Sequence, residues 1–261
     1  MQRRPPLCQC GTTHSMPREK LMAVERFTRI YDGPGGPFEG VVAFDTSSEA
    51  PRPGVLVVPN ILGQKESDNL KAEALAALGY VGFVIDVYGQ GKRVTPDSPD
   101  RAIHMNALNA DRELLRDRLA ASLAELKTLP QVDASRTAAI GFCFGGKCAL
   151  DLARSGADLL GIVSFHGVYD RPSYPNVVPI KAKVLVCHGW EDPIAPPDAT
   201  VALANELNES GADWQIHAYG HTGHAFTDLS ANRVAEKMFY QPDADRRSWK
   251  AMTNFLEELF G

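Results

Sequence analysis

A cysteine lies at the centre of a pentad that begins and ends with glycine, Gly141 to Gly145. The apolar run 138–140 predicts a strand and the amphipathic pattern 147–152 predicts a helix, so Cys143 would occupy a sharp strand-to-helix turn. Flanking glycines permit the strained backbone of such a turn, and a helix N-terminus favours a negatively charged thiolate because its backbone N–H groups are unpaired. Cys143 is therefore a candidate nucleophile, with a small buried hydrophobic residue as the alternative.

Two more reactive side chains follow predicted strands later in the chain. Asp192 comes after the apolar run 184–187, and His224 comes after the alternating run 214–219. Because the carboxyl ends of parallel strands meet at one edge of a sheet, we expect both residues to lie near Cys143, where ligands of open α/β sheets bind. A cysteine nucleophile needs a base, and the base needs an orienting group. The three residues therefore predict acyl transfer, with His224 as the base and Asp192 as its partner.

The elements that would position these residues alternate along the chain. Two segments rich in β-forming residues, 25–31 and 38–44, are separated by a Gly- and Pro-rich turn and predict an antiparallel hairpin. From residue 54 onward, continuous apolar runs alternate with helical patterns, which predicts an α/β fold with a doubly wound, mainly parallel sheet. The further predicted strands are 54–58, 81–87, 160–165, 184–187 and 214–219, and the further predicted helices are 68–78, 108–126, 199–207 and 244–260.

Two segments before the pentad are assigned to the surface. The loop 88–100 combines Gly, Pro and charged residues, as expected of an active-site rim. On the predicted helix 108–126 the leucines define one apolar face, and the charged residues on the other faces predict a solvated surface. These charged residues are Arg112, Glu113, Arg116, Asp117 and Arg118.

Composition limits the class of protein and its partners. The chain has 261 residues, of which 44% are hydrophobic and 23% are charged, as expected of one sizeable globular core. We assign residues 21–261 to a single domain and residues 1–20 to a disordered N-terminal tail. The formal net charge of −5 and the lack of a basic stripe argue against a nucleic acid partner. No apolar run approaches the roughly 20 residues of a membrane-spanning helix, so no membrane is expected.

The cysteines and the N-terminus indicate the compartment. Five cysteines without regular spacing do not indicate a disulfide framework, which favours a reducing, cytoplasmic setting. The N-terminal segment has arginines but no apolar stretch after them, so it lacks the features of a secretory signal. Met16 is an alternative start of the chain, and the pair Cys8 and Cys10 is only weak evidence for a metal site.

Three motifs of this sequence resemble those of the dienelactone hydrolase family. They are GFCFGG at 141–146, HGWEDP at 188–193 and GHAF at 223–226, and as a set they are specific. The resemblance extends from about the predicted hairpin to the terminal helix, and it implies an α/β-hydrolase fold. We expect neither a cofactor nor a metal.

The resemblance implies a role for each reactive residue. Cys143 is the nucleophile of a Cys-His-Asp triad, His224 is its general base and then acid, and Asp192 holds the imidazole. An oxyanion hole is implied as well, formed by the backbone N–H groups of Ile61 and Phe144. Such donors typically supply a large part of the catalytic effect, because they bind charge that develops in the transition state.

Two departures from that family bear on the substrate. Dienelactone-cleaving members carry a Glu where this chain has Asn60, and an amide cannot take a proton, so the histidine would activate the thiol more directly. Those members also hold a substrate carboxylate with arginines, whereas the matching stretches 88–90 and 226–228 have none, and Asp228 would oppose an anion. We therefore expect a neutral ester or lactone with an apolar or aryl group. The candidate pocket residues are Asn60, Tyr88, Trp190 and Phe226.

Two other functions remain open. The first is attack by Cys143 on a neutral phosphotriester, with the same backbone donors holding the phosphoryl oxygen. The second is a non-enzymatic thiol redox-sensing or binding module, with Cys148 or Cys187 near the reactive thiol. Metal-dependent hydrolysis is disfavoured because the cysteines and histidines lack zinc-like spacing, and His188 and His221 are assigned structural or supporting roles. The expected partner is a small-molecule ester, and the expected state is a monomer or a homodimer.

Overall fold

The computed structural model describes residues 23–261. The predicted N-terminal tail, with Cys8, Cys10 and Met16, lies outside these residues. No helix between residues 23 and 261 is both long enough and apolar enough to cross a membrane. In chain order the elements are β1 (Val24–Tyr31), β2 (Phe38–Asp45), β3 (Arg52–Val58), α1 (Glu66–Ala77), β4 (Val81–Val84), α2 (Ile103–Ala110), α3 (Arg112–Thr128), β5 (Val132–Phe142), α4 (Phe144–Arg154), β6 (Gly161–Phe165), β7 (Lys183–Gly189), α5 (Pro197–Glu209), β8 (Trp214–Tyr219), β9 (Asn232–Arg233), a short 3₁₀-helix (Val234–Glu236), β10 (Met238–Phe239) and α6 (Pro242–Phe260).

Eight strands form one sheet in the order β1-β2-β4-β3-β5-β6-β7-β8. β1 and β2 pair antiparallel as a hairpin, β2 pairs antiparallel with β4, and the other strands of this sheet pair in parallel. This topology confirms the predicted α/β class with an antiparallel leading hairpin. The central strands are apolar along most of their length because both of their faces are covered.

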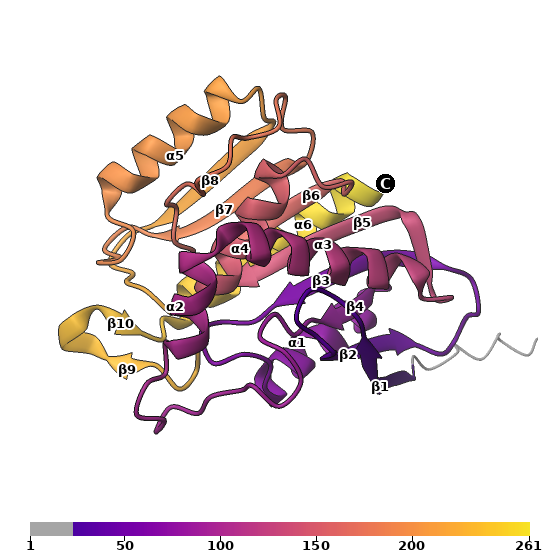
Figure 1. The fold of residues 1–261 in the computed structure, drawn as a ribbon. Coiled ribbons are helices and arrows are strands. Elements are labelled where there is room, and N and C mark those ends of the chain that lie inside the picture. The colour runs from indigo at the N-terminus through magenta and orange to yellow at the C-terminus, as the bar shows by residue number, and fades with distance from the viewer. Residues whose placement is uncertain (1–22) are drawn as a thin grey trace, which may run out of the picture.

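Helices cover both faces of the sheet (Figure 1). On one face, α3, α4 and α5 pack over a buried cluster that includes Leu56 and Leu119. On the other face, α1 and α6 pack over a second cluster that includes Val57 and Met252. The strand that follows β3 in the chain, β4, pairs with one side of β3. The next strand, β5, pairs with the opposite side of β3. The carboxyl ends of β3 and β5 therefore flank the point where the strand order reverses, which is where ligands of doubly wound sheets bind.

Several boundaries differ from those predicted from the sequence. The predicted strand 81–87 ends at Val84, because Asp86 closes a turn by accepting hydrogen bonds from the backbone that follows it. The predicted helix 108–126 is two helices, α2 and α3, which break at Asp111, where φ is −131° and ψ is 80°. The side chain of Asp111 caps the start of α3. The small β9–β10 hairpin was not predicted, since its strands are too short to show a pattern.

Two of the charged residues assigned to a solvated face of α3 are buried, so that assignment is wrong for them. Arg112 is 7% exposed and Arg118 is 8% exposed. The guanidinium of Arg112 pairs with Asp151 of α4, and that of Arg118 donates to the carbonyl oxygen of Val87 at 2.9 Å. These partners lie 39 and 31 residues away along the chain, so helical periodicity could not reveal them.

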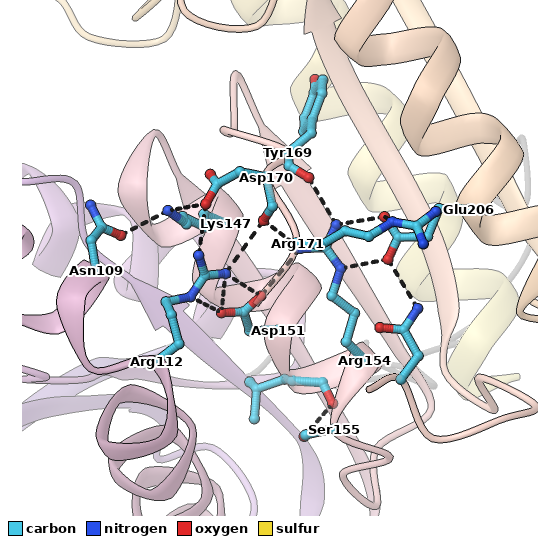
Figure 2. Close-up of polar contacts among 12 residues, drawn as sticks. Asn109, Arg112, Lys147, Asp151, Arg154, Ser155, Tyr169, Asp170, Arg171 and Glu206 are labelled. Atoms are coloured by element: carbon cyan, nitrogen blue, oxygen red, sulfur yellow. Dashed lines mark hydrogen bonds and ion pairs between the residues drawn. The ribbon is translucent and has the colours of Figure 1, made fainter. Parts of the chain in front are cut away.

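A buried ion network ties α4 to the helices beside it (Figure 2). Asp151 on α4 accepts hydrogen bonds from Arg112 of α3 at 2.7 Å and from Arg154 at 3.2 Å. Arg154 in turn pairs with Glu206 of α5 at 2.8 Å. All four side chains are buried, and charges out of contact with water require this degree of mutual pairing. The network therefore holds α4, whose first turn follows Cys143, between α3 and α5.

Replacing Asp151 by Ala should lower the free energy of unfolding by about 3–5 kcal/mol, because Arg112 and Arg154 would stay buried without their shared carboxylate. Urea denaturation followed by circular dichroism measures this loss. The control is Asp158→Ala, which breaks an ion pair between Lys127 and a fully exposed carboxylate and should change stability little. Equally small losses in the two variants would contradict this account of the network.

Candidate active site

Cys143 lies at the turn between β5 and α4 with a backbone that residues other than glycine rarely adopt. Its φ is 55° and its ψ is −114°. A Cβ on Gly141 would lie 1.9 Å from the carbonyl oxygen of Gly145, and a Cβ on Gly145 would lie 2.1 Å from that of Val58. Only glycine fits at these two positions, so the pentad forms the strand, turn and helix that its sequence predicts. Backbone strain of this kind costs about 1–3 kcal/mol and is concentrated at functional sites.

Asp192 and His224 form a hydrogen-bonded pair at the same edge of the sheet. Asp192 follows β7, and its Oδ1 accepts from the backbone N–H groups of Ile194 at 2.8 Å and Ala195 at 3.2 Å. Its Oδ2 lies 2.7 Å from Nδ1 of His224, which follows β8. Both side chains are almost completely buried. The carboxyl group of Asp192 thus holds the imidazole ring in one orientation.

The charge of the His224 imidazole depends on Cys143 and Asp192. Burial alone would lower the pKa of His224. The neighbouring charge of Cys143, together with the hydrogen bond and the charge of Asp192, outweighs burial and raises that pKa to about 10. The raised pKa favours the protonated imidazolium of His224, beside the sulfur of Cys143, at neutral pH.

His166 is part of this site, although it was not predicted from the sequence. It directly follows β6, is buried, and has a φ of 37°. Its ring meets that of His224 edge-on at a centroid distance of 5.2 Å, and its Nε2 lies 2.8 Å from Oγ1 of Thr227. Burial and the neighbouring His224 hold the pKa of His166 well below its usual value, so it stays neutral. The signal was its position after the predicted strand 160–165, which matches the position of Asp192 after its own strand.

Tyr88 connects the two backbone segments that carry Ile61 and Phe144. Its hydroxyl donates to the carbonyl oxygen of Ile61 at 3.1 Å, and its ring stacks on that of Phe144 at a centroid distance of 6.1 Å. Asn60 closes the turn around Ile61, because its Oδ1 accepts from the N–H of Leu62 at 3.0 Å. Phe144 is the first residue of α4, so its N–H has no acceptor within the helix. Tyr88 is buried and supports both segments from beneath, which differs from its expected place in a pocket wall.

The other candidate pocket residues occupy three different environments. Asn60 lines a cavity of about 630 Å³ beside the site. Phe226 is fully buried and packs edge-on against His166 at a centroid distance of 5.0 Å, so it lies under the site and not in its wall. Trp190 is exposed and meets His188 edge-on at 6.2 Å. His188 is itself buried and hydrogen-bonded to two side-chain hydroxyl groups, as its structural assignment requires.

The remaining cysteines and histidines are less suited to reaction than Cys143. Cys148 and Cys187 are fully buried, whereas Cys143 is partly accessible. Burial raises the pKa of Cys148 well above its usual range and that of Cys187 to about 12, so both stay protonated. His221 is exposed and lies 3.2 Å from Glu191. In the part of the chain that the structure describes, no three His, Cys, Asp or Glu side chains are placed to hold a metal ion.

Known proteins share this fold and much of this sequence. The model of the dienelactone hydrolase family matches residues 38–260. A solved structure named m3DLH is 38% identical with a TM-score of 0.86, over 92% of this chain and 100% of that chain. The crystal structure of a dienelactone hydrolase-like promiscuous phosphotriesterase from metagenomic libraries is 35% identical with a TM-score of 0.85, over 92% of this chain and 100% of that chain.

A curated bacterial relative points to the same family. It is a Bradyrhizobium protein named "Probable 2-oxo-3-(5-oxofuran-2-ylidene)propanoate lactonase", 26% identical over 78% of this chain and 83% of its own length. The family match runs from β2 to α6 and includes Cys143, Asp192 and His224. The eight-stranded sheet with helices on both faces is the α/β-hydrolase fold of these neighbours. The chain is a hydrolase-fold protein that belongs to the dienelactone hydrolase family.

Proposed function

We propose that the protein hydrolyses neutral carboxylic esters or lactones through a cysteine acyl-enzyme. The observation that carries this proposal is the position of Cys143, on a strained turn at the N-terminus of α4 and beside a histidine whose Nδ1 lies 2.7 Å from Asp192. In this arrangement Cys143 is the nucleophile, His224 is the general base and acid, and Asp192 orients the imidazole. The name of the Bradyrhizobium relative, a lactonase, supports lactones as a substrate class.

The reaction proceeds in two halves. In the first half, the sulfur of Cys143 attacks the carbonyl carbon, a carbon–sulfur bond forms, and the carbonyl oxygen becomes an oxyanion. Collapse of this intermediate breaks the ester carbon–oxygen bond, and His224 gives its Nε2 proton to the departing alkoxide. In the second half, His224 takes a proton from water and the resulting hydroxide attacks the thioester. The acid then leaves, and the thiolate and imidazolium are restored.

The backbone N–H groups of Ile61 and Phe144 bind the oxyanion in this mechanism. The N–H of Phe144 is unpaired at the start of α4, and the Ile61 segment is held by the hydroxyl of Tyr88. One oxyanion donor typically contributes about 3 kcal/mol to transition-state stabilisation, provided that it is already in place when the charge develops. The contacts of Tyr88 with both segments supply this preorganisation.

The charged residues around the site favour a neutral substrate. Arg93, in the loop after β4, lies 3.1 Å from Glu39 and is therefore not directed at a substrate anion. Lys65 and Lys71 both pair with the buried carboxylate of Asp68. These cations already have carboxylate partners, so an anionic substrate would gain little from them and would lose its hydration on entering.

Neutral phosphotriesters are a second candidate substrate class for the same thiol. The observation in favour is the structural neighbour named a promiscuous phosphotriesterase, which is 35% identical to this chain. Cys143 would attack phosphorus, the phosphorus–oxygen bond to the aryl group would break, and His224 would protonate the leaving oxygen. Water would then cleave the phosphorus–sulfur bond. We propose this reaction as a side activity, because one site often accepts more than one chemistry.

Wild-type protein mixed with p-nitrophenyl acetate or butyrate should release a burst of p-nitrophenolate, and acid-quenched samples should gain the mass of one acyl group. Cys143→Ala should show neither signal, because it lacks the nucleophile. Cys148→Ala, which removes a fully buried thiol, should keep both signals and is the matched control. An acyl-enzyme in Cys143→Ala would refute the proposal. With a diethyl aryl phosphate, a missing phosphoryl adduct on the wild type would remove only the second candidate.

The variant Tyr88→Phe keeps the ring on Phe144 but removes the hydroxyl that holds the Ile61 carbonyl. We expect kcat for p-nitrophenyl butyrate to fall about tenfold with KM nearly unchanged, because a displaced oxyanion donor weakens binding of the transition state only. The control is Tyr80→Phe, a buried tyrosine at the opposite edge of the sheet that packs against Phe260. Equal kcat losses in both variants, or a change in KM alone, would contradict this role of Tyr88.

A further inference from the structure

A cavity of about 630 Å³ lies beside the candidate active site, between α1, α6 and the carboxyl ends of β5 and β6. Its floor contains Phe142 and Phe165, whose rings stack at a centroid distance of 4.7 Å and an interplanar angle of 11°. Ala74 of α1 and Trp249 of α6 belong to its walls. Cavities of this size and with such apolar walls are typical of small-molecule sites.

Three residues that line the cavity are linked to the reaction centre, two through the chain and one through side-chain contacts. Asn60, in its wall, directly precedes Ile61, and Phe142, in its floor, directly precedes Cys143. Thr227, also in its wall, is hydrogen-bonded to His166, whose ring meets that of His224. The nucleophile itself does not line the cavity. A substrate whose carbonyl is at Cys143 would therefore place only an extended arm in this space.

The charged residues in the walls are balanced in number, with three cations (Lys65, Lys71 and Arg246) and three carboxylates (Asp68, Asp228 and Asp245). Lys65 and Lys71 lie 3.2 Å and 3.3 Å from oxygens of Asp68. Oδ1 of Asp228 accepts hydrogen bonds from the N–H of Ser230 at 3.0 Å and from its hydroxyl at 2.7 Å. A charged arm would lose its hydration here without meeting a net opposite charge, so the cavity favours an uncharged arm.

Lys71 favours an aromatic arm over an aliphatic arm of the same size. Its Nζ lies 4.5 Å from the centroid of the Phe142 ring, and the side chain is partly exposed to the cavity. An ammonium group attracts the face of an aromatic ring, and it can lie between two rings at once. Nζ also hydrogen-bonds to the Ser67 carbonyl oxygen and to Oδ1 of Asp68, at 3.3 Å each, so a planar ring entering the cavity would pack on the part of the Lys71 side chain that stays exposed.

We infer that this cavity binds an uncharged aromatic arm of the ester substrate, with Lys71 selecting aromatic over aliphatic groups. The inference rests on the proposed ester hydrolysis and names the class of its substrate. The arm belongs either to the acid or to the alcohol half of the ester, and the two cases share the same chemistry. Substrates that extend one half at a time distinguish them.

The test fills the cavity from α1 with Ala74→Trp and uses Ala77→Trp, an exposed position on the same helix, as the matched control. Five esters are compared: ethyl acetate, phenylacetate and cyclohexylacetate, which vary the acid half, and phenyl and 2-naphthyl acetate, which vary the alcohol half. Ala74→Trp should lower kcat/KM for the large aromatic esters of one series by about 10- to 100-fold, as expected for loss of a hydrophobic subsite. It should change ethyl acetate, which has no aromatic arm, by less than about twofold, and Ala77→Trp should change none.

A second variant, Lys71→Met, tests the aromatic preference. The wild type should prefer the phenylacetate over the cyclohexylacetate by about 2- to 30-fold, and Lys71→Met should lose most of this preference, because it removes the cation and keeps the apolar stem. The inference would be overturned if Ala74→Trp left kcat/KM for the aromatic esters unchanged, or if it lowered kcat/KM equally for all five esters. A wild type without any acyl-enzyme would instead refute the proposed function, so the two failures are distinguishable.

Discussion

The left-handed backbone of Cys143 is the constraint on which the rest of the site depends. Strain at this residue, with φ at 55°, persists only because the surrounding packing leaves the turn no alternative. Gly141 and Gly145 let β5, α4 and the end of β3 approach more closely than any side chain would permit. The buried ions of Asp151 and Arg154 then hold α4 from its other end. The sulfur is thereby presented at the start of a helix, where negative charge is favoured.

The sheet topology brings the other groups to this sulfur. The strand order reverses between β3 and β5, so the segment after β3, with Ile61, and the turn after β5, with Cys143, flank one crevice. β6, β7 and β8 follow in parallel, and the loops after them carry His166, Asp192 and His224, respectively. Each of these loops supplies one group of the same site, although 81 residues separate the cysteine from the histidine along the chain. The arrangement follows from parallel pairing alone.

Much of this could be predicted, because continuous apolar runs reveal buried strands and the residues after them must share an edge. The same reasoning would have identified His166, because its strand and the glycine after it can be recognised in the sequence. Burial of Arg112 could not be predicted, since its partner Asp151 comes from another helix. Tyr88 and Phe226 are aromatic residues next to the site, and only the packing shows that they support it from beneath.

We expect His224 to remain protonated beside the sulfur of Cys143. Its pKa is raised to about 10, so its ion pair with Asp192 is present at neutral pH and is lost as the pH rises through that value. Nitrogen-15 NMR of the imidazoles, with the His224 signal assigned by its absence in His224→Gln, measures this directly. We expect a titration midpoint near 10 in the wild type and a lower one in Cys143→Ala and Asp192→Asn. A wild-type midpoint near the ordinary histidine value of about 6.5, unchanged in both variants, would contradict it.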